Sequence, residues 1–383
     1  MNDPARFEFR DPARGRELLQ RLESLVEGIG RRISVMHVCG SHEQALARYG
    51  LRTSLPRGLR VVMGPGCPVC VTDAPEIDAA IALARKGAHV LTYGDMLRVP
   101  GGSCSLEEAR AEGARVSVVY SALQAVDIAR HSTEPVVFFA TGFETTAVAT
   151  AAVLDDHPPA NFYVLSAHKY VPPAMEVVAA SPDSRIEGFL AAGNAAIITG
   201  YGLFEPFAAE HRVPVVVAGF EPLDIVAGLV KLVELVALGR AEVVNAYPRC
   251  VTREGNRPAL GKLFKVFERR DGEWRGIAQI PGGDLRLRPE YSAWDARERF
   301  DMASALVAPE LSGLAAHCRC GAIMAGSAEP SDCTLFGNEC RPESPQGACM
   351  VSSEGACRIW HQYGLGLRSE QELARLRVRE SSP

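Results

Sequence analysis

The stretch Gly64-Pro65-Gly66-Cys67-Pro68-Val69-Cys70 directly follows the apolar run Leu59–Met63, which predicts a buried strand. Two glycines and two prolines impose a tight turn on this stretch, and the turn presents two thiols in a C-x-x-C spacing. Such a pair can close as a disulfide or share a metal. Because it follows a strand in an α/β pattern, it favours a redox site. A structural turn with two buried cysteines is the alternative.

Short apolar runs alternate with helical segments on both sides of this stretch. The apolar runs predict strands at Ile33–Val38, Leu59–Met63, His89–Tyr93, Arg115–Tyr120, Val136–Ala140, Asn161–Ser166, Gly188–Leu190 and Pro214–Ala218. The segments between them predict helices, including Arg14–Ile29, Glu43–Tyr49, Glu76–Lys86 and Ser105–Glu112. This rhythm predicts an α/β fold with largely parallel sheets that are covered on both faces.

The sequence also contains an internal repeat. Three pairs of stretches match in order: Cys39-Gly40-Ser41-His42-Glu43 with Thr141-Gly142-Phe143-Glu144-Thr145-Thr146, Gly64–Pro68 with Ser166-Ala167-His168-Lys169, and Val118–Ile128 with Val216–Ile225. The repeat predicts two similar Rossmann-like domains, at 31–131 and 132–240. Chance similarity between generic strand–helix units is the alternative. The unusual polar residues all follow strands, so we expect them to line one cleft between the two facing domains.

After about residue 240 the strand–helix rhythm stops. The sequence there predicts only short elements: strands at Leu263–Glu268 and Gly276–Gln279, a short helix at Tyr291–Phe300, and a charged helix near Ser369–Val378. We expect a third, cysteine-rich α+β domain formed by 241–383 together with the N-terminal helix in 1–30.

Composition restricts the class of protein. The chain has 383 residues, of which 47% are hydrophobic and 23% charged, and its net charge is −5, so neither nucleic acid nor an anionic membrane is an expected partner. The longest apolar run, Asp224–Gly239, is interrupted by Lys231 and Glu234, which argues against a membrane span. The first residues do not resemble a signal peptide, and the 11 cysteines are an odd number. We therefore expect a cytoplasmic protein whose cysteines bind metal or react.

Six of these cysteines lie close together near the C-terminus: Cys318, Cys320, Cys333, Cys340, Cys349 and Cys357. The spacers between them are rich in Gly, Pro and Ser, which lets a backbone turn around an iron–sulfur cluster. The short spacings of bacterial ferredoxins and of zinc ribbons are absent. Spacing alone therefore leaves zinc or buried thiols open.

Three other positions carry candidate chemistry. Cys39 ends a strand at a predicted helix N-terminus, which would stabilise a thiolate, and His42 could cap the helix, bind metal or shuttle protons. Glu144 follows a strand and could accept a proton or merely cap a helix. His168-Lys169 could bring positive charge to the thiols or form a solvated turn. A small buried cysteine is the alternative for Cys39, and no phosphate-binding loop is found.

These motifs together resemble the HypD family of hydrogenase maturation proteins. The resemblance rests on Cys39–Glu43, Gly64–Cys70, Thr141–Thr146 and the stretch from Asp332-Cys333 to Cys357, and it covers nearly the whole chain. It implies a cytoplasmic scaffold, rather than a conventional turnover enzyme, on which the Fe(CN)2CO unit of [NiFe]-hydrogenases is assembled. It also implies two similar α/β domains and a third domain with a [4Fe-4S] cluster.

The resemblance assigns roles to individual residues. The family's cluster pattern, C-x12-C-x6-C-x16-C, selects Cys320, Cys333, Cys340 and Cys357 as cluster ligands, with Cys318 as an alternative to Cys320 and Cys349 outside the pattern. Cys39 would bind the iron of the Fe(CN)2CO unit, shared with a cysteine of a small HypC-like chaperone. Cys67 and Cys70 would be a redox-active pair that takes electrons relayed from the cluster, and a HypE-like partner would deliver cyanide.

Two positions depart from the family pattern. His37 stands where a glutamate is expected, and Asn194 stands where a histidine is expected. Asn194 neither titrates near neutral pH nor binds iron as an imidazole would.

One competing hypothesis is a cluster-dependent dithiol/disulfide oxidoreductase without iron cargo. It would not require Cys39, whereas a scaffold would. A nucleotide-dependent transferase would need the phosphate site that the sequence lacks.

Overall fold

The computed structural model describes residues 9–182, 184–302 and 316–366. Within these ranges the chain is a mixed α/β protein with two sheets, as the strand–helix rhythm predicts. The described residues form two compact units. Unit 1 is drawn from Met1–Gly66, Ala174–Arg257 and Ala325–Ser327, and unit 2 from Cys67–Pro173, Pro258–Met324 and Ala328–Pro383. Each sheet belongs to one unit.

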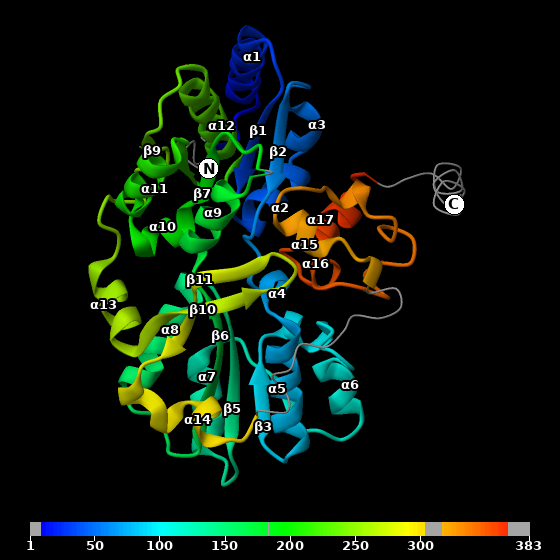
Figure 1. The fold of residues 1–383 in the computed structure, drawn as a ribbon, viewed down its shortest axis with the longest axis vertical. Helices are drawn as coiled ribbons and strands as arrows, with labels where there is room; N and C mark the ends of the chain where they lie inside the picture. The colour runs from blue at the N-terminus through cyan, green and yellow to red at the C-terminus, as the bar shows by residue number, and fades with distance from the viewer. Residues whose placement is uncertain (1–8, 183, 303–315, 367–383) are drawn as a thin grey trace, which may run out of the picture. The chain divides into compact units, whose positions relative to one another are not determined.

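The sheet of unit 1 has five parallel strands in the order β2-β1-β7-β8-β9 (Figure 1). The strands are β1 (Ile33–His37), β2 (Leu59–Met63), β7 (Phe189–Ala192), β8 (Val215–Ala218) and β9 (Val243–Asn245). The helices of this unit are α1 (Pro12–Ile29), α2 (Gly40–Arg48), α3 (Leu51–Ser54), α10 (Gly193–Thr199), α11 (Phe204–His211) and α12 (Pro222–Ala237), and α9 (Val171–Ala180) runs from unit 2 into unit 1.

The first helix shows how the sequence builds unit 1. Asp11 caps α1 by accepting hydrogen bonds from the backbone N–H groups of Ala13 and Arg14, and Gly30 ends the helix in the left-handed conformation. Leu22 and Val26 are buried in a core that α12 and the strands of this sheet complete. This packing places α1 in unit 1, which differs from the expected grouping of 1–30 with 241–383.

The sheet of unit 2 has six strands in the order β10-β11-β6-β5-β3-β4. The strands are β3 (His89–Thr92), β4 (Val116–Val118), β5 (Val136–Gly142), β6 (Phe162–Lys169), β10 (Phe267–Trp274) and β11 (Ala278–Leu287). The first four pair in parallel, whereas the β10–β11 hairpin joins β6 antiparallel. Its helices include α4 (Pro68–Val71), α5 (Ala74–Arg85), α6 (Leu106–Ala111), α7 (Ala122–Arg130), α8 (Glu144–Asp155), α13 (Arg257–Val266), α14 (Ala296–Arg299), α15 (Cys320–Met324), α16 (Ala348–Val351) and α17 (Ala356–Gln362).

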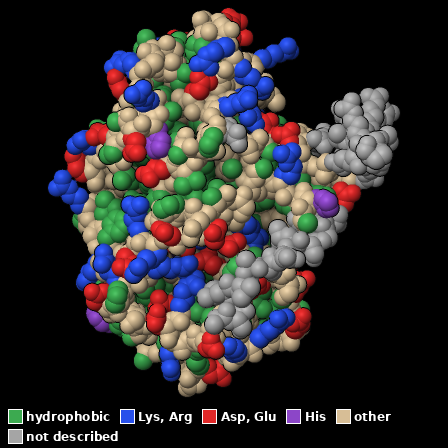
Figure 2. All heavy atoms as spheres, in the orientation of Figure 1, with side chains coloured by type: hydrophobic (Ala, Val, Ile, Leu, Met, Phe, Trp, Pro, Cys, Tyr) green, Lys and Arg blue, Asp and Glu red, His purple; other side chains and the backbone are tan. Residues whose placement is uncertain are grey.

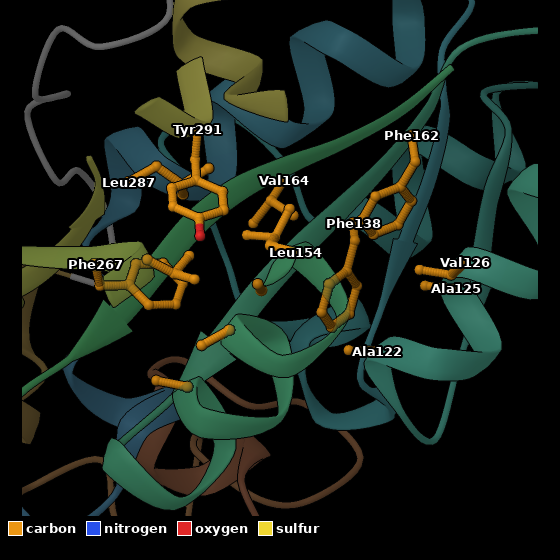
Figure 3. Close-up of a cluster of buried hydrophobic side chains, with 14 of the residues drawn as sticks. Ala122, Ala125, Val126, Phe138, Leu154, Phe162, Val164, Phe267, Leu287 and Tyr291 are labelled. Carbon is orange, nitrogen blue, oxygen red and sulfur yellow. The ribbon is translucent and has the colours of Figure 1, made fainter. Parts of the chain in front are cut away.

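The core of unit 2 lies between its sheet and the helices on one face. Phe138 and Val164 on neighbouring strands meet Phe267 and Tyr291 from the C-terminal half, so distant parts of the chain share this core (Figure 3). Every residue of β5 and of β6 is buried, which is why both strands are continuously apolar until their carboxyl ends.

All eight strands expected between residues 33 and 218 are confirmed, with shifts of a few residues at their ends. Their pairing differs from the expectation of one sheet in 31–131 and another in 132–240, because each sheet combines strands from both ranges. A strand–helix rhythm reports local structure only, and partners are chosen by long-range packing.

The expected strand at Leu263–Glu268 is largely wrong. Residues up to Val266 belong to α13, which buries Leu263 and Val266, and β10 begins at Phe267. The expected strand at Gly276–Gln279 is the start of the longer β11, and the expected helix at Tyr291–Phe300 is two short helical turns. The expected helix at Ser369–Val378 lies outside the described residues.

The described part of the cysteine-rich segment packs within unit 2, except for Ala325–Ser327 in unit 1, and does not form a separate third unit. None of the helices in the described residues is both long and apolar enough to cross a membrane. Basic and acidic side chains are interspersed over the face that Figure 2 shows.

Candidate functional site

Cys39 lies at the carboxyl end of β1, the point at which the chain turns into α2. Its backbone is extended, and its side chain is 7% exposed. The sheet order places β1 between β2 and β7. After β1 the chain adds β2 on one side of it, and later adds β7 and the remaining strands on the other side, so the strand order reverses at β1. In open parallel sheets this position is where ligands bind. The location of Cys39 is therefore the one that the sequence predicted for a functional thiol.

A buried charged network lies directly beside Cys39. His37 Nδ1 is 3.1 Å from the carbonyl oxygen of Cys39, and its Nε2 is 2.7 Å from Glu43 Oε2. Arg52 binds both oxygens of Glu43. Burial alone would raise the pKa of Glu43, but Arg52 and His37 outweigh it and hold that pKa well below its usual value. Glu43 is thus an ionised carboxylate in the interior.

His42 presents an unused lone pair in the same region. Its Nε2 lies 3.0 Å from the carbonyl oxygen of Gly219 and so carries the proton, while its Nδ1 is buried without a hydrogen-bond partner. Burial, and then the neighbouring His37, lower the pKa of His42 to about 3. A neutral imidazole with a free nitrogen can accept a hydrogen bond or bind a metal.

The loop after β2 packs against the turn that carries Cys39. The Gly64 N–H donates to the carbonyl oxygen of His37 at 2.8 Å, and the Gly40 N–H donates to the carbonyl oxygen of Gly66 at 3.0 Å. A Cβ atom on Gly66 would overlap the backbone of Val38 and Cys39. Glycine is required here because two backbones touch. The next residue in the chain is Cys67.

In unit 2, Cys67 and Cys70 form a disulfide across the single turn of α4. Both residues are fully buried, and the Cys70 N–H donates to Cys67 Sγ at 3.1 Å. The end of this helix is tied to the hairpin, because the Arg275 N–H donates to the carbonyl oxygen of Val71 at 3.0 Å. The C-x-x-C motif is therefore a closed dithiol on a short helix after a strand.

The six C-terminal cysteines come together in unit 2, on and around the helices α15, α16 and α17. Figure 1 shows these three helices grouped together. Five of them are buried and Cys318 is half-buried. The helices α15 and α16 both pack against α4, so the cysteine cluster adjoins the disulfide.

Three of these thiols are hydrogen-bonded neighbours, because Cys349 contacts both Cys320 and Cys357. The contact with Cys349 and burial raise the pKa of Cys320 well above its usual value. Burial raises the pKa of Cys318 to about 12, and Cys320, Cys333 and Cys340 are among the thiols near it.

The donor set fits an iron–sulfur cluster chemically. Cluster ligands are thiolates that converge from loops, and here a Cβ atom on Gly347 would collide with the sulfur of Cys318. A cavity of about 440 Å³ adjoins Cys318 and Cys320 and is also lined by Arg275. Within residues 9–182, 184–302 and 316–366, no three Cys, His, Asp or Glu side chains are arranged as ligands of one metal ion. A four-iron cluster binds each thiolate through a different iron, so it needs no such arrangement.

Comparison with known proteins identifies the family of this chain. A sequence model of HypD, described as the hydrogenase formation hypA family, matches residues 14–364. The chain belongs to the HypD family.

Curated relatives share this length. A hydrogenase maturation factor HypD of Azotobacter vinelandii is 42% identical over 370 residues, covering 93% of this chain and 96% of the relative. A factor of the same name from Rhizobium leguminosarum bv. viciae is 44% identical over 372 residues, covering 93% and 94%. A putative hydrogenase expression/formation protein of Methanocaldococcus jannaschii is 40% identical over 360 residues, covering 93% and 98%.

Glu144 is the first residue of α8, directly after the turn that follows β5. It is 1% exposed, and its Oε1 accepts a hydrogen bond from the Val171 N–H at 2.8 Å. Its Oε2 is buried without a hydrogen-bond partner. Burial raises the pKa of Glu144 to about 7, so this carboxyl can gain or lose a proton near neutral pH.

His168 and Lys169 do not form a solvated turn, because both are fully buried at the end of β6. Lys169 Nζ lies 2.7 Å from Asp284 and 3.3 Å from Glu76, so its charge is paired inside unit 2. Burial lowers the pKa of His168 to about 4, which leaves it neutral. Sequence analysis missed Glu76 and Asp284. The helix α5 also carries Asp78 and the strand β11 also carries Arg286, so nothing in the local sequence marks these two carboxylates as buried.

Asn194 follows β7, the strand next to β1 in the sheet of unit 1. Its side chain is exposed, and its Oδ1 accepts a hydrogen bond from the adjacent Ala195 N–H at 2.9 Å. The structure thus brings Cys39, His42 and the glycine loop together in unit 1, with Asn194 on a neighbouring strand end. It brings the disulfide and the cysteine cluster together in unit 2.

Proposed function

We propose that this chain is a scaffold on which the Fe(CN)2CO unit of [NiFe]-hydrogenases is assembled, with Cys39 as its ligand for the iron. Membership of a family of hydrogenase maturation factors supports the general role. The position of Cys39 at a ligand-binding strand end, close in sequence to the neutral His42 with its free Nδ1, carries the specific one. A soft thiolate suits low-valent iron with strong-field ligands.

The redox part of this proposal uses the thiols of unit 2. Cys333, Cys340 and Cys357 would hold a [4Fe-4S] cluster together with either Cys320 or Cys318. When bound, the cluster would supply single electrons near the Cys67–Cys70 disulfide. The packing of α15 and α16 against α4 supports this assignment, because electron transfer needs the two groups to be close.

The proposed partners are a small HypC-like chaperone, which would share the iron through its own cysteine, and a HypE-like protein, which would deliver cyanide. The proposed compartment is the cytoplasm, where a reducing environment keeps unpaired thiols available. Fe(CN)2CO is cargo in this scheme, so the chain acts as an assembly platform.

The alternative function is a cluster-dependent dithiol oxidoreductase that carries no iron cargo. The closed, buried disulfide beside the cysteine cluster favours it as the second candidate. Such an oxidoreductase would not need Cys39.

An infrared spectrum separates the two functions. The protein would be purified without oxygen after co-expression with the small chaperone and the cyanide-delivery proteins. We expect bands from metal-bound CO and CN in the wild type and in the control Cys250→Ala, which removes an exposed thiol of unit 1. Cys39→Ala should lack them. If a sample with an intact cluster and bound chaperone shows no bands, or if Cys39→Ala keeps them, the scaffold role of Cys39 is wrong.

A further inference from the structure

Glu144 has one carboxylate oxygen whose position is not explained by the fold. Oε1 holds the start of α9 through the Val171 N–H. Oε2 is buried without a hydrogen-bond partner, in a residue that is 1% exposed. Buried polar atoms are rarely left without a partner, and those that are often serve a function. A purely structural role would need only the first oxygen.

Two independent packing contacts bring the chain segment next to Glu144 close to the disulfide helix. The helix α4 packs against β5, whose last residue, Gly142, lies two positions before Glu144. Separately, Phe143 stacks on Trp274 with ring centroids 6.0 Å apart, and the next residue of the hairpin, Arg275, donates its N–H to Val71 at the end of α4. Both contacts lie within unit 2. Two adjacent hairpin residues therefore make these contacts: Trp274 holds Phe143, and Arg275 holds the end of the disulfide helix.

Reduction of this disulfide requires protons in a place without bulk water. Cys67 and Cys70 are each 0% exposed. When a thiolate of a reducing dithiol attacks one sulfur, the S–S bond breaks and the other sulfur leaves as a thiolate. A buried thiolate is costly unless it is protonated. A protonated carboxyl next to it can meet this need as a general acid.

We propose that Glu144 is the proton donor to the sulfur that leaves when the Cys67–Cys70 disulfide is reduced, and that it takes the proton back when the disulfide re-forms. The second thiol of the reducing dithiol then attacks the mixed disulfide and releases the other cysteine. The products are two cysteine thiols in the protein and one cyclic disulfide in the reagent. Solvent supplies the second proton and reprotonates Glu144. The inference rests on the redox role proposed for this dithiol.

The surroundings of Glu144 support this role because they leave its charge uncompensated. The strand β5 carries no titratable side chain, and neither does α4 apart from its cysteine. On α7, Arg130 and Asp127 bind each other at 2.8 Å. At the other end of α8, Asp155 is paired with Lys262 and Lys265.

On β6 the titratable side chains are Tyr163, His168 and Lys169, and none of them places an unpaired charge at Glu144. His168 is neutral because burial lowers its pKa to about 4, and Lys169 is paired with Asp284 and Glu76. Burial then raises the pKa of Glu144 to about 7, so the carboxyl holds its proton in acid and loses it above neutral pH.

The test compares disulfide reduction rates of the full-length protein across pH. Dithiothreitol reduces the oxidised protein, and the free thiols of Cys67 and Cys70 are alkylated and quantified by mass spectrometry. At about pH 6 we expect Glu144→Gln to be reduced at least about tenfold more slowly than the wild type. Above about pH 8 the two rates should converge, because Glu144 has then lost its proton in the wild type. The ionisation of dithiothreitol affects both proteins equally, so it cancels when the variant rate is divided by the wild-type rate at each pH. Glu144→Asp should restore part of the rate.

Two further readouts separate this role from a structural one. Glu107→Gln removes an exposed carboxylate of the same unit and should behave as the wild type. In infrared spectra recorded before and after reduction, the wild type should show a change in a protonated-carboxyl band that Glu144→Gln lacks. The proposal is overturned if the reduction rate of Glu144→Gln, divided by that of the wild type, is close to one at about pH 6. It is also overturned if this ratio is lowered equally at every pH.

These measurements need no iron cargo, so their outcome is independent of the Cys39 experiment. If the ratio of the two reduction rates does not change with pH, Glu144 is not the proton donor, and the scaffold proposal is still decided by its own test. Loss of the scaffold assignment would in turn leave the result for Glu144 standing.

Discussion

Position 37 shows how a residue that departs from the family pattern is accommodated. The family resemblance leads us to expect a glutamate there, and this chain has His37. His37 binds the buried carboxylate of Glu43, which Arg52 also binds, beside the backbone of Cys39. Glu43 belongs to the motif on which the resemblance rests, so His37 adds a partner for this carboxylate and does not replace one.

Two cysteines are candidates for the fourth ligand of the proposed cluster. Cys320 is buried at the start of α15, and Cys318 is half-buried two residues before it. Both lie near Cys340 and Cys357. The family spacing implies Cys320, which we therefore take as the proposed ligand.

This choice predicts different iron contents for two matched variants. Cys320→Ser should lose most of the cluster absorbance and iron, while Cys318→Ser should retain them, because only the first removes a ligand. Iron and sulfide analysis of anaerobically purified protein measures both. Retention by Cys320→Ser together with loss by Cys318→Ser would show that Cys318 is the ligand instead.

At the scale of elements, the approach of the glycine loop to the start of α2 is highly sensitive to substitution. A Cβ on Gly66 would overlap the backbone of Val38 and Cys39, and no flexible side chain could move away. We expect Gly66→Ala to lower the free energy of unfolding by about 3 kcal/mol, the upper end for overpacked sites. It should also displace Cys39 and so reduce the infrared bands of the cargo.

Gly28→Ala is the matched control. Gly28 lies in α1 of the same unit, and a Cβ there would meet no atom within 4 Å. Alanine should therefore stabilise the protein by ~0.5–1 kcal/mol through its higher helix propensity. Urea unfolding of both variants provides the comparison. Equal stability of Gly66→Ala and the wild type would show that the loop does not hold this close approach.

At the scale of the whole molecule, each unit has a hydrophobic core of its own. Leu22 belongs to the core of unit 1 and Phe138 to that of unit 2, and both are 0% exposed. We expect Leu22→Ala to cost about 2–5 kcal/mol and Phe138→Ala about 3–5 kcal/mol, because each leaves a cavity. Native-state hydrogen exchange should show the loss of protection mainly in β1 and β2 for the first variant and in β5 and β6 for the second. Equal losses in both sheets for either variant would mean that the chain unfolds as one cooperative unit.

Local patterns in the sequence are sufficient to predict the strands between residues 33 and 218 and the chemistry that follows them. The buried strands are continuous apolar runs, and Cys39, the C-x-x-C motif and Glu144 each follow such a run at the point where the chain turns. The placement of all these residues at the carboxyl ends of strands is therefore confirmed. The family motifs are also short and contiguous, which is why the amino-acid sequence is enough to recognise the family.

The choice of which elements pack together is made by the tertiary structure. It placed strands of both sequence ranges in each sheet, packed α1 against α12, and brought the β10–β11 hairpin to β6. It also buried Lys169 between carboxylates that lie far from it in sequence. The physical reason is that strand pairing, burial and charge pairing depend on contacts between residues distant in the chain, and the periodicity of a single segment carries no information about its partner.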